Sequence, residues 1–316
     1  MEGSSYRILP DWASYIGKIL ILVGMVLVFG SIGVMISTQL CKFIFQIDFT
    51  QIDLNAIKKE DVQVIAALKL FQTLSGGIGM FLIPALLFPK VIKYPIESMI
   101  TYKMVPKFWM LLIAFVLIIV SVPLISWLYH FNQYLSFPAA WSELEQQIRT
   151  MENQAAQLTK VFIAADTIPM LMLNIFVVAL VPAICEEFFF RGILLQYTRF
   201  VFSNQWVAII VSAVVFSGFH GQFYGFLPRF VLGMFLGYLY LRGGGIWVVV
   251  FAHFVNNAMA VLTSYYEKEL AAFPFFNEEY LFPWYWVILS MATIYGLFRL
   301  YNWAFWQHLQ NKIKKR

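Results

Sequence analysis

Long apolar stretches alternate with short polar ones along most of the chain. Several apolar stretches approach the roughly 20 residues that an α-helix needs to cross the hydrocarbon core of a membrane. The fifth and sixth are shorter and fit tilted or partly embedded helices. The pattern predicts an all-α, polytopic transmembrane helix bundle of about eight spans. The predicted spans cover residues 15–38, 64–88, 108–129, 168–189, 206–220, 228–241, 246–264 and 283–305.

One connection, between the third and fourth predicted spans, differs from the others. Residues 141–166 are polar, rich in Gln, Glu and Ala, and contain neither Pro nor Gly. This composition favours a surface helix whose apolar side rests on the protein or on the bilayer. We find no internal repeat and no low-complexity tract that would indicate a different architecture.

The composition agrees with a membrane protein. Of 316 residues, 61% are hydrophobic and 12% are charged, whereas soluble domains carry about 25% charged residues. The mean hydropathy is +0.74. Cys41 and Cys185 form no metal-ligand pattern or disulfide framework, and we expect two reduced, packed thiols. The N-terminal residues lack the pattern of a removable signal peptide, so we expect the first apolar segment to be a retained span.

Basic residues collect in alternate connections. The connection 89–107 carries four lysines against one glutamate, whereas the connection 265–282 carries four glutamates against one lysine. The C-terminal tail is basic, and the connections after the fourth and sixth spans carry Arg191, Arg199 and Arg242. With eight spans, these basic segments and both termini fall on one side, which the positive-inside rule assigns to the cytoplasm. The net charge of +5 is thus an orientation signal and a contact with anionic lipid, not a nucleic-acid patch.

Ionisable side chains inside membrane spans are rare, and they usually face a protein interior or a water-filled cavity. In a helix, Glu187 and Arg191 are four residues apart and face one another, and His253 and Asn257 likewise share one side. Glu186 is rotated by about 100° from Glu187. We therefore expect one carboxylate to pair with the arginine and the other to be free for chemistry.

Each of these features also has an ordinary structural explanation. The pair of Glu187 and Arg191 is typical of a charge-neutralised helix end, and His220 is typical of a hydrogen-bonded histidine at the membrane interface. His253 and Asn257 are equally typical of polar contacts between membrane helices. It is their occurrence together, on consecutive spans, that favours a shared site.

Three short motifs follow one another on these spans. EEFFFR (186–191) fits EExxxR, FSGFH (216–220) fits FxxxH and HFVNN (253–257) fits HxxxN. In this order and spacing they resemble the CPBP family, which covers the type II CAAX prenyl endopeptidases and the bacteriocin-processing and immunity (Abi) proteins. The resemblance implies a catalytic core at 165–268. It would follow N-terminal spans and the polar helix (1–164) and precede the last span and a basic cytoplasmic tail (269–316).

The resemblance implies an intramembrane endopeptidase that hydrolyses a peptide bond of a membrane-associated protein or peptide. Such a reaction needs an activated water, a stabiliser for the oxyanion and a proton for the leaving amine. The first glutamate of the motifs matches the residue that activates water together with the first histidine. The last two residues match the groups that hold the oxyanion or a metal. The implied catalytic set is Glu186, Glu187, His220, His253 and Asn257, with Arg191 and Phe216 in structural support.

The role of a metal is open at the level of sequence. Two histidines and a glutamate can furnish a catalytic zinc site, and His220, His253 and Glu186 are the candidate ligands. The spacing is not HExxH, however, and Asn257 is a better oxyanion donor than zinc ligand. We therefore favour a mechanism with no required cofactor. The expected partners are a membrane-associated substrate and the lipid bilayer, and the sequence indicates neither prenylation of the substrate nor an oligomeric state.

Two other classes of protein share some of these features. A transporter or channel also buries charges, but it would favour repeated halves with broken helices. A catalytically silent immunity or interaction protein on the same scaffold would be expected to lack a motif residue. For an enzyme, Glu186, His220, His253 and Asn257 should face one polar cavity. Regular full-length spans would separate the first two, so the short fifth span must be tilted or the cavity must reach the bilayer interior.

Overall fold

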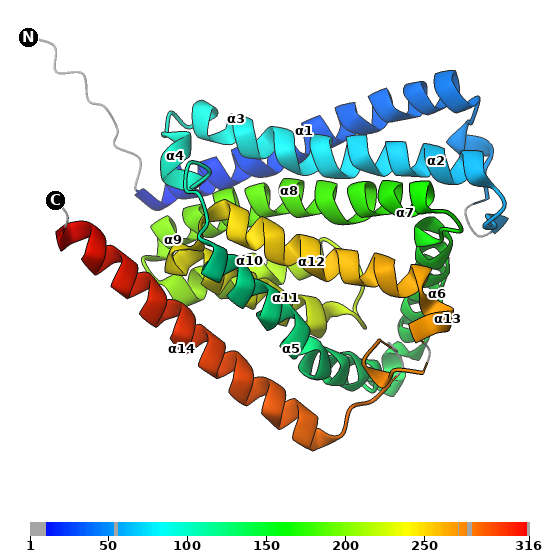
Figure 1. Cartoon of the computed structure of the whole chain (residues 1–316). Coiled ribbons are helices and arrows are strands. Elements are labelled where there is room, and N and C mark those ends of the chain that lie inside the picture. Colours follow the sequence, from blue (N-terminus) through cyan, green and yellow to red (C-terminus); the bar gives the residue numbers. More distant parts are fainter. Residues whose placement is uncertain (1–10, 54–55, 271, 277–279, 315–316) are drawn as a thin grey trace, which may run out of the picture.

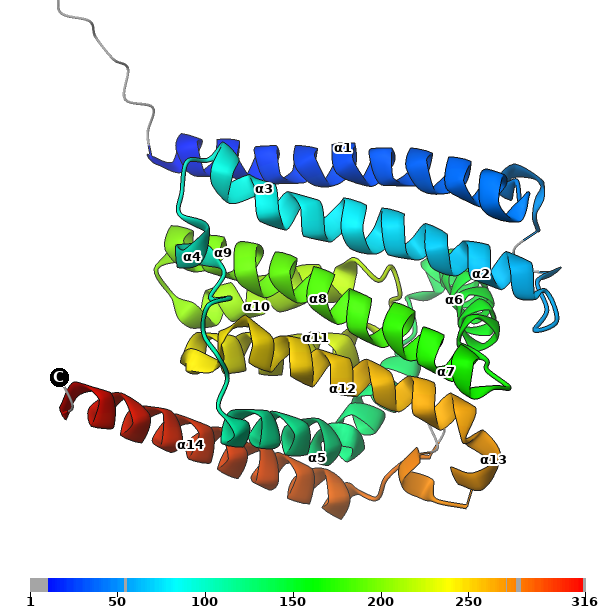
Figure 2. The same ribbon diagram turned by 45° about the horizontal axis from the view of Figure 1, so that its top comes forward.

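The computed structural model describes residues 11–53, 56–270, 272–276 and 280–314, and every regular element within them is helical (Figure 1). Helices form at all eight predicted segments and run alternately in opposite directions through one bundle (Figure 2). The fold is an all-α helix bundle, as predicted. The eight helical spans are α1 (Asp11–Phe45); α2, η3 and α3 (Val62–Phe71, Gln72–Leu82, Ile83–Val91); α5 (Phe108–Gln133); α7, η5, α8, η6 and α9 (Ile168–Asn174, Ile175–Leu180, Val181–Glu187, Phe188–Leu195, Gln196–Phe202); α10 (Gln205–Gly218); α11 (Phe226–Leu239); α12 (Gly245–Tyr265); and α14 (Trp284–Lys314).

Shorter elements lie at the two ends of the bundle. The polar segment predicted as a surface helix is α6 (Ser142–Ile163), which lies across one end between α5 and α7 (Figure 1). Both cysteines are buried free thiols, as predicted. The remaining short elements are η1 (Phe49–Gln51), α4 (Ile96–Met99), η4 (Ala139–Trp141), η7 (Tyr240–Gly244), α13 (Glu267–Leu270) and η8 (Pro274–Phe276).

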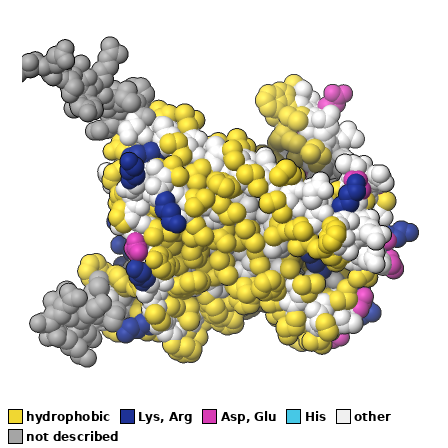
Figure 3. Space-filling model, turned by 90° about the horizontal axis from the view of Figure 1, so that it is seen from above, with side chains coloured by type: hydrophobic (Ala, Val, Ile, Leu, Met, Phe, Trp, Pro, Cys, Tyr) yellow, Lys and Arg dark blue, Asp and Glu magenta, His cyan; other side chains and the backbone are white. Residues whose placement is uncertain are grey.

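The outer surface of the bundle is suited to a membrane. Among the described residues, five helical ranges are long and apolar enough to cross one. Apolar side chains cover the middle of the face seen in Figure 3, with charged side chains at its two ends. The range Phe226–Tyr265 reverses direction near Gly243, so it consists of the two antiparallel helices α11 and α12. The φ of Gly243 is +89°, a backbone conformation that favours glycine. The chain is a multi-pass membrane protein.

Lys and Arg gather at the end of the bundle where the described chain begins and finishes (Figures 1 and 3). This end holds the connection between α3 and α5 and the turn between α11 and α12 (Figure 1). The opposite end carries both signs of charge. The assignment of Arg191 to a basic connection was wrong, because Arg191 lies inside the fourth helical span, is 1% exposed and adds no charge to a connection. Which end faces the cytoplasm stays a prediction. Four residues of the predicted charge pattern, Glu278, Glu279, Lys315 and Arg316, lie outside the described residues.

The fourth helical span is longer than predicted, and its length brings the motifs together. The predicted end at residue 189 was wrong, because the helix continues through η6 to Phe202. Glu187 and Arg191, whose charges suggested a helix end, are instead paired with each other inside the protein. By contrast, α10 has 14 residues and is about 21 Å long, too short for a hydrocarbon core of about 30 Å. The end of α10 therefore places His220 near Glu186.

Close packing of the second span against its neighbours depends on glycine. A Cβ atom on Gly79 would lie 2.9 Å from the carbonyl oxygen of Phe29, so the π-helical segment η3 approaches α1 as only glycine allows. On another side of η3, a Cβ atom on Gly77 would lie 3.5 Å from Sγ of Cys185. The second span therefore packs between α1 and the helix that carries Glu186.

Candidate functional site

The two adjacent glutamates of α8 lie in different surroundings. Glu187 is fully buried, and its Oε1 lies 2.6 Å from Nη1 of Arg191 and 2.7 Å from Nδ1 of His253. Glu186 keeps 17% of its side chain exposed, and its buried Oε2 has no hydrogen-bond partner among the described residues. The structure thus contains the predicted pair of Glu187 with Arg191 and leaves the other carboxylate free.

Arg191 connects three helices through one guanidinium. Besides its bond to Glu187, it donates from Nη2 to the carbonyl oxygen of Gly233 on α11 at 3.2 Å. The guanidinium carbon also lies 4.5 Å from the centre of the Phe216 ring on α10, a cation–π contact. A buried charge is tolerated only when it is paired and hydrogen-bonded. Arg191 therefore ties the glutamate-bearing helix to α10 and α11.

His253 lies between the two glutamates. Because a carboxylate only accepts hydrogen bonds, its contact with Glu187 places a proton on Nδ1 of the imidazole. Nε2 then faces Glu186, with 4.0 Å between that nitrogen and Oε2. The edge of the ring packs against Phe216, with 5.8 Å between the ring centres. The Glu187 carboxylate thus sets the orientation of the imidazole with respect to Glu186.

A cavity of about 110 Å³ lies beside the free carboxylate, and Glu186 and His220 both line it. Water occupies about 30 Å³ per molecule in the liquid, so the cavity has room for a few water molecules. Nδ1 of His220 lies 3.0 Å from the carbonyl oxygen of Phe216. A carbonyl oxygen only accepts, so Nδ1 carries the proton, and in the neutral imidazole Nε2 of His220 is then an acceptor. The other residues that line the cavity are Phe81, Phe190 and Phe219.

Phe216 lies at the centre of this arrangement. Its ring centre is 5.2 Å from that of His220 and 5.2 Å from that of Phe190, and it also contacts Arg191 and His253. It is 2% exposed. This position fits the structural support expected of the aromatic residue in the second motif.

Asn257 is one of the predicted site residues that do not line the cavity. Its amide nitrogen lies 3.4 Å from the carbonyl oxygen of Val178, and its amide oxygen accepts from Asn256 at 3.1 Å. Pro182 has no N–H for the carbonyl four residues before it, that of Val178. Asn257 therefore donates to an oxygen whose α-helical partner is missing. Of the four residues expected to face one polar cavity, Glu186 and His220 line it and His253 and Asn257 do not, and three of the five lining residues are phenylalanines.

The predicted zinc ligands do not form a metal-binding cluster in this arrangement. Among the described residues, no three His, Cys, Asp or Glu side chains are grouped so that they could hold a metal ion. Oε2 of Glu186 and Nε2 of His253 are 4.0 Å apart. Both histidines use Nδ1 for protein contacts, which leaves Nε2 of each ring as the nitrogen that could bind a metal. The structure therefore does not bring the three predicted ligands into one cluster, and both the favoured reaction without a cofactor and the alternative zinc site stay predictions.

Sequence reasoning missed two parts of the site. Phe81 reaches the cavity from the second span, and nothing in its local sequence distinguishes it from other apolar residues. The loop that carries His220 is bound by Asn132 on α5 and Glu152 on α6, both outside the motif-bearing region. The polar character of the α6 segment predicts a surface helix and does not by itself indicate a contact with the His220 loop.

Comparison with known proteins agrees with the motifs. Residues 168–259 match the family model described as type II CAAX prenyl endopeptidase Rce1-like. A protein of Bacillus subtilis (strain 168) named "Putative membrane peptidase YdiL" is 33% identical over 101 residues, which are 31% of this chain and 39% of that protein. The chain thus aligns with less than half of this relative's length. No solved structure matches the chain. The family resemblance is confirmed over the segment that contains all three motifs, and the predicted domain boundaries stay predictions.

Proposed function

We propose that the protein is an intramembrane endopeptidase in which Glu186 activates a water molecule to hydrolyse a peptide bond of a membrane-associated protein or peptide. The observation that carries the proposal is the meeting of Glu186, from α8, and His220, from the loop after α10, at one cavity of about 110 Å³. The match of residues 168–259 to a prenyl endopeptidase family and the relative named as a membrane peptidase support the same class of reaction.

In the proposed reaction, the Glu186 carboxylate takes a proton from a water molecule that also donates to Nε2 of His220. The hydroxide oxygen bonds to the carbonyl carbon of the substrate, and the carbonyl oxygen becomes an oxyanion. The proton on Glu186 then passes to the leaving nitrogen as the C–N bond breaks. The products are a carboxylic acid and an amine, so one water is consumed and the protons balance.

His253 is proposed to stabilise the oxyanion. With both ring nitrogens protonated, it donates to Glu187 through Nδ1 and to the oxyanion through Nε2, on the side of Glu186. Asn257 is the second proposed donor, and in this role its amide must leave the carbonyl oxygen of Val178 when the substrate binds. Glu187 and Arg191 hold the histidine in place and do not touch the reacting atoms.

The proposed substrate enters from the membrane, and the basic end of the bundle, where the described chain begins and finishes, is proposed to face the cytoplasm. The matched family is described as prenyl endopeptidases of the CAAX type, so a farnesylated CAAX peptide is the first substrate to test. A leader peptide, the tail of a membrane protein and a peptide toxin are the other candidates. No cofactor is required in the proposed mechanism.

The two rival classes are less well supported. A transporter needs a path lined by polar groups, whereas Glu187 and Arg191 are buried and bound to each other. A silent scaffold protein does not need a free carboxylate beside a histidine at a cavity, and Glu186 and His220 form this arrangement.

The proposal is tested by comparing the membrane proteomes of cells that lack the chromosomal gene and express the wild type, Glu186→Ala or Glu60→Ala. Glu60 is an exposed glutamate in the connection before α2 and is the matched control. We expect uncleaved precursors to accumulate with Glu186→Ala alone. Identical membrane proteomes for all three strains would contradict the proposal and favour a silent scaffold protein.

A further inference from the structure

The loop that carries His220 is rich in glycine. In GFHGQFYG (218–225), three of eight residues are glycine, and Gly221 has a φ of +63°. Glycine leaves a chain many accessible conformations, so the loop sequence by itself does not hold an imidazole in one place. The bond of His220 to the carbonyl oxygen of Phe216 fixes the start of the loop. The rest of the loop is held by groups from other helices.

Asn132 at the end of α5 binds this loop on one side. Its amide nitrogen donates to the carbonyl oxygen of Phe223 at 2.9 Å, and its amide oxygen accepts from the backbone N–H of Leu227 at 2.9 Å. The side chain is 1% exposed. One buried amide therefore links the loop to the first turn of α11.

Glu152 on α6 binds the same loop on another side. Its Oε1 accepts from the backbone N–H of Phe223 at 2.6 Å, and both carboxylate oxygens lie 3.2 Å from the N–H of Tyr224. Within the described part of the chain, Glu152 forms no salt bridge, so these backbone amides are its hydrogen-bond partners. Hydrogen bonds to a carboxylate are shorter and stronger than those between neutral groups. Glu152 therefore fixes the loop three and four residues after His220.

A second contact holds α6 itself in position on the loop. Glu145 accepts hydrogen bonds from the hydroxyl of Tyr224 at 3.1 Å and from the backbone N–H of Phe137 at 2.9 Å, and the Arg149 guanidinium stacks 3.9 Å from the centre of the Tyr224 ring. Hydrogen bonds from Phe137 and Arg149 hold the pKa of Glu145 below its usual value, so it stays a carboxylate at neutral pH. Glu145, Arg149 and Glu152 repeat at helical spacing and share one face of α6.

We propose that Glu152 is a positioning residue for His220, and that α6 thereby fixes the loop on which the reaction depends. The inference rests on the proposed function for its catalytic part. Glu152 does not line the cavity and acts through the backbone of Phe223 and Tyr224. Both Glu152 and Asn132 lie outside the family match at 168–259. The N-terminal part of the chain thus supplies the support that places a motif histidine.

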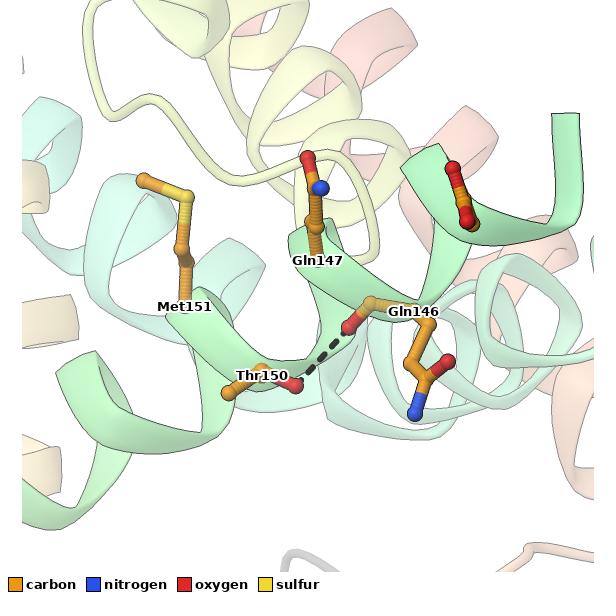
Figure 4. Close-up of a pocket in the computed structure, with 5 residues that line it drawn as sticks. Gln146, Gln147, Thr150 and Met151 are labelled. Atoms are coloured by element: carbon orange, nitrogen blue, oxygen red, sulfur yellow. Dashed lines mark hydrogen bonds between the residues drawn. The ribbon is translucent and has the colours of Figure 1, made fainter.

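The opposite face of α6 provides the control. Figure 4 shows Gln146, Gln147, Thr150 and Met151 on that face, where the one bond drawn runs from the Thr150 hydroxyl to the carbonyl oxygen of Gln146. These residues and Glu143 border an open hollow of about 570 Å³. Glu143 is exposed, so Glu143→Gln changes the charge of the same helix on the face away from Glu152 and is the matched control for Glu152→Gln.

The test uses full-length wild type, Glu152→Ala, Glu152→Gln and Glu143→Gln in lipid nanodiscs. Hydrogen–deuterium exchange of the peptide that covers 219–227 is measured first. Loss of the charge-assisted bonds should speed exchange of this peptide by about 10-fold or more in Glu152→Ala. Glu152→Gln keeps one acceptor and should lie between this variant and the wild type, whereas Glu143→Gln should match the wild type.

Cleavage of a farnesylated CAAX peptide is measured on the same four samples. A displacement of about 1 Å in a catalytic group costs on the order of 100-fold in rate, so Glu152→Ala should lower kcat by about 10- to 100-fold at unchanged KM. Unchanged exchange in Glu152→Ala overturns the positioning role, whether or not the wild type cleaves the peptide. Faster exchange with unchanged kcat also overturns it. If the Ala variant does not fold, Glu152→Gln decides between the same outcomes. A wild type that fails to cleave, with faster exchange in Glu152→Ala, overturns the catalytic part of the inference and leaves the structural contact.

Discussion

Replacing Arg191 by Ala should destabilise the protein strongly, because it leaves Glu187 buried without its cationic partner. The side chains of Arg191 and Glu187 are 1% and 0% exposed, and their atoms approach to 2.6 Å. Removing one partner of a buried ion pair costs about 3–5 kcal/mol. The loss of the bond to Gly233 and of the contact with Phe216 acts in the same direction. At about 2–4 °C per kcal/mol, the melting temperature should fall by on the order of 10 °C.

The assay is thermal unfolding in detergent of the wild type, Arg191→Ala and Arg199→Ala. Arg199 lies two turns further along the same helical span and is exposed, so its replacement should leave the melting temperature nearly unchanged. The double variant Glu187→Gln/Arg191→Ala should be more stable than Arg191→Ala, because it no longer buries an unpaired carboxylate. Arg191→Ala protein as heat-stable as the wild type would refute the assignment of Arg191 as a structural partner.

Two further changes test the packing around the site. Phe216→Ala should lower the free energy of unfolding by about 3–5 kcal/mol and abolish peptide cleavage, since the ring contacts Arg191 and both histidines. Phe216→Leu should recover stability more than activity. Equal activity of Phe216→Ala and wild type would argue against this role. Gly79→Val should lower the melting temperature because its side chain would meet the backbone of α1. Gly76→Val should not, because an added Cβ there would make only an ordinary contact, at 3.9 Å from the side chain of Gln72. Equal melting temperatures for the two would contradict the close approach of η3 and α1.

The sequence predicted the helices well because each is a long apolar stretch, and membrane burial leaves a helix as the simplest way to satisfy the backbone. It failed at the end of the fourth span. Glu186, Glu187 and Arg191 look like an exit from the membrane in a hydropathy pattern. In the folded protein, Arg191 and His253 bind Glu187, so two of these charges are buried within the helix. A pattern along one helix cannot show partners that come from other helices.

The same limit applies to the site. The i,i+4 spacing correctly predicted that Glu187 and Arg191 face one another, because this geometry is local. Helical spacing did not predict that Asn257 would turn to Val178, since that contact is made with a different helical span. It also did not predict that Glu152 binds the His220 loop, 71 residues away in sequence. Local spacing predicts neighbours on one helix, while packing decides what they meet.

The central claim is that the Glu186 carboxylate is the base that activates water. The most direct measurement is cleavage of a farnesylated CAAX peptide by purified wild type and Glu186→Gln in lipid vesicles, side by side and before and after exhaustive dialysis against a strong chelator. Glutamine keeps the size of the side chain but removes the basic oxygen, and loss of general-base catalysis costs about 10²- to 10⁴-fold in rate. We predict that Glu186→Gln is nearly inactive and that the dialysed wild type keeps its activity. Undiminished cleavage by Glu186→Gln, or activity lost on chelation and restored by stoichiometric zinc, would contradict this account.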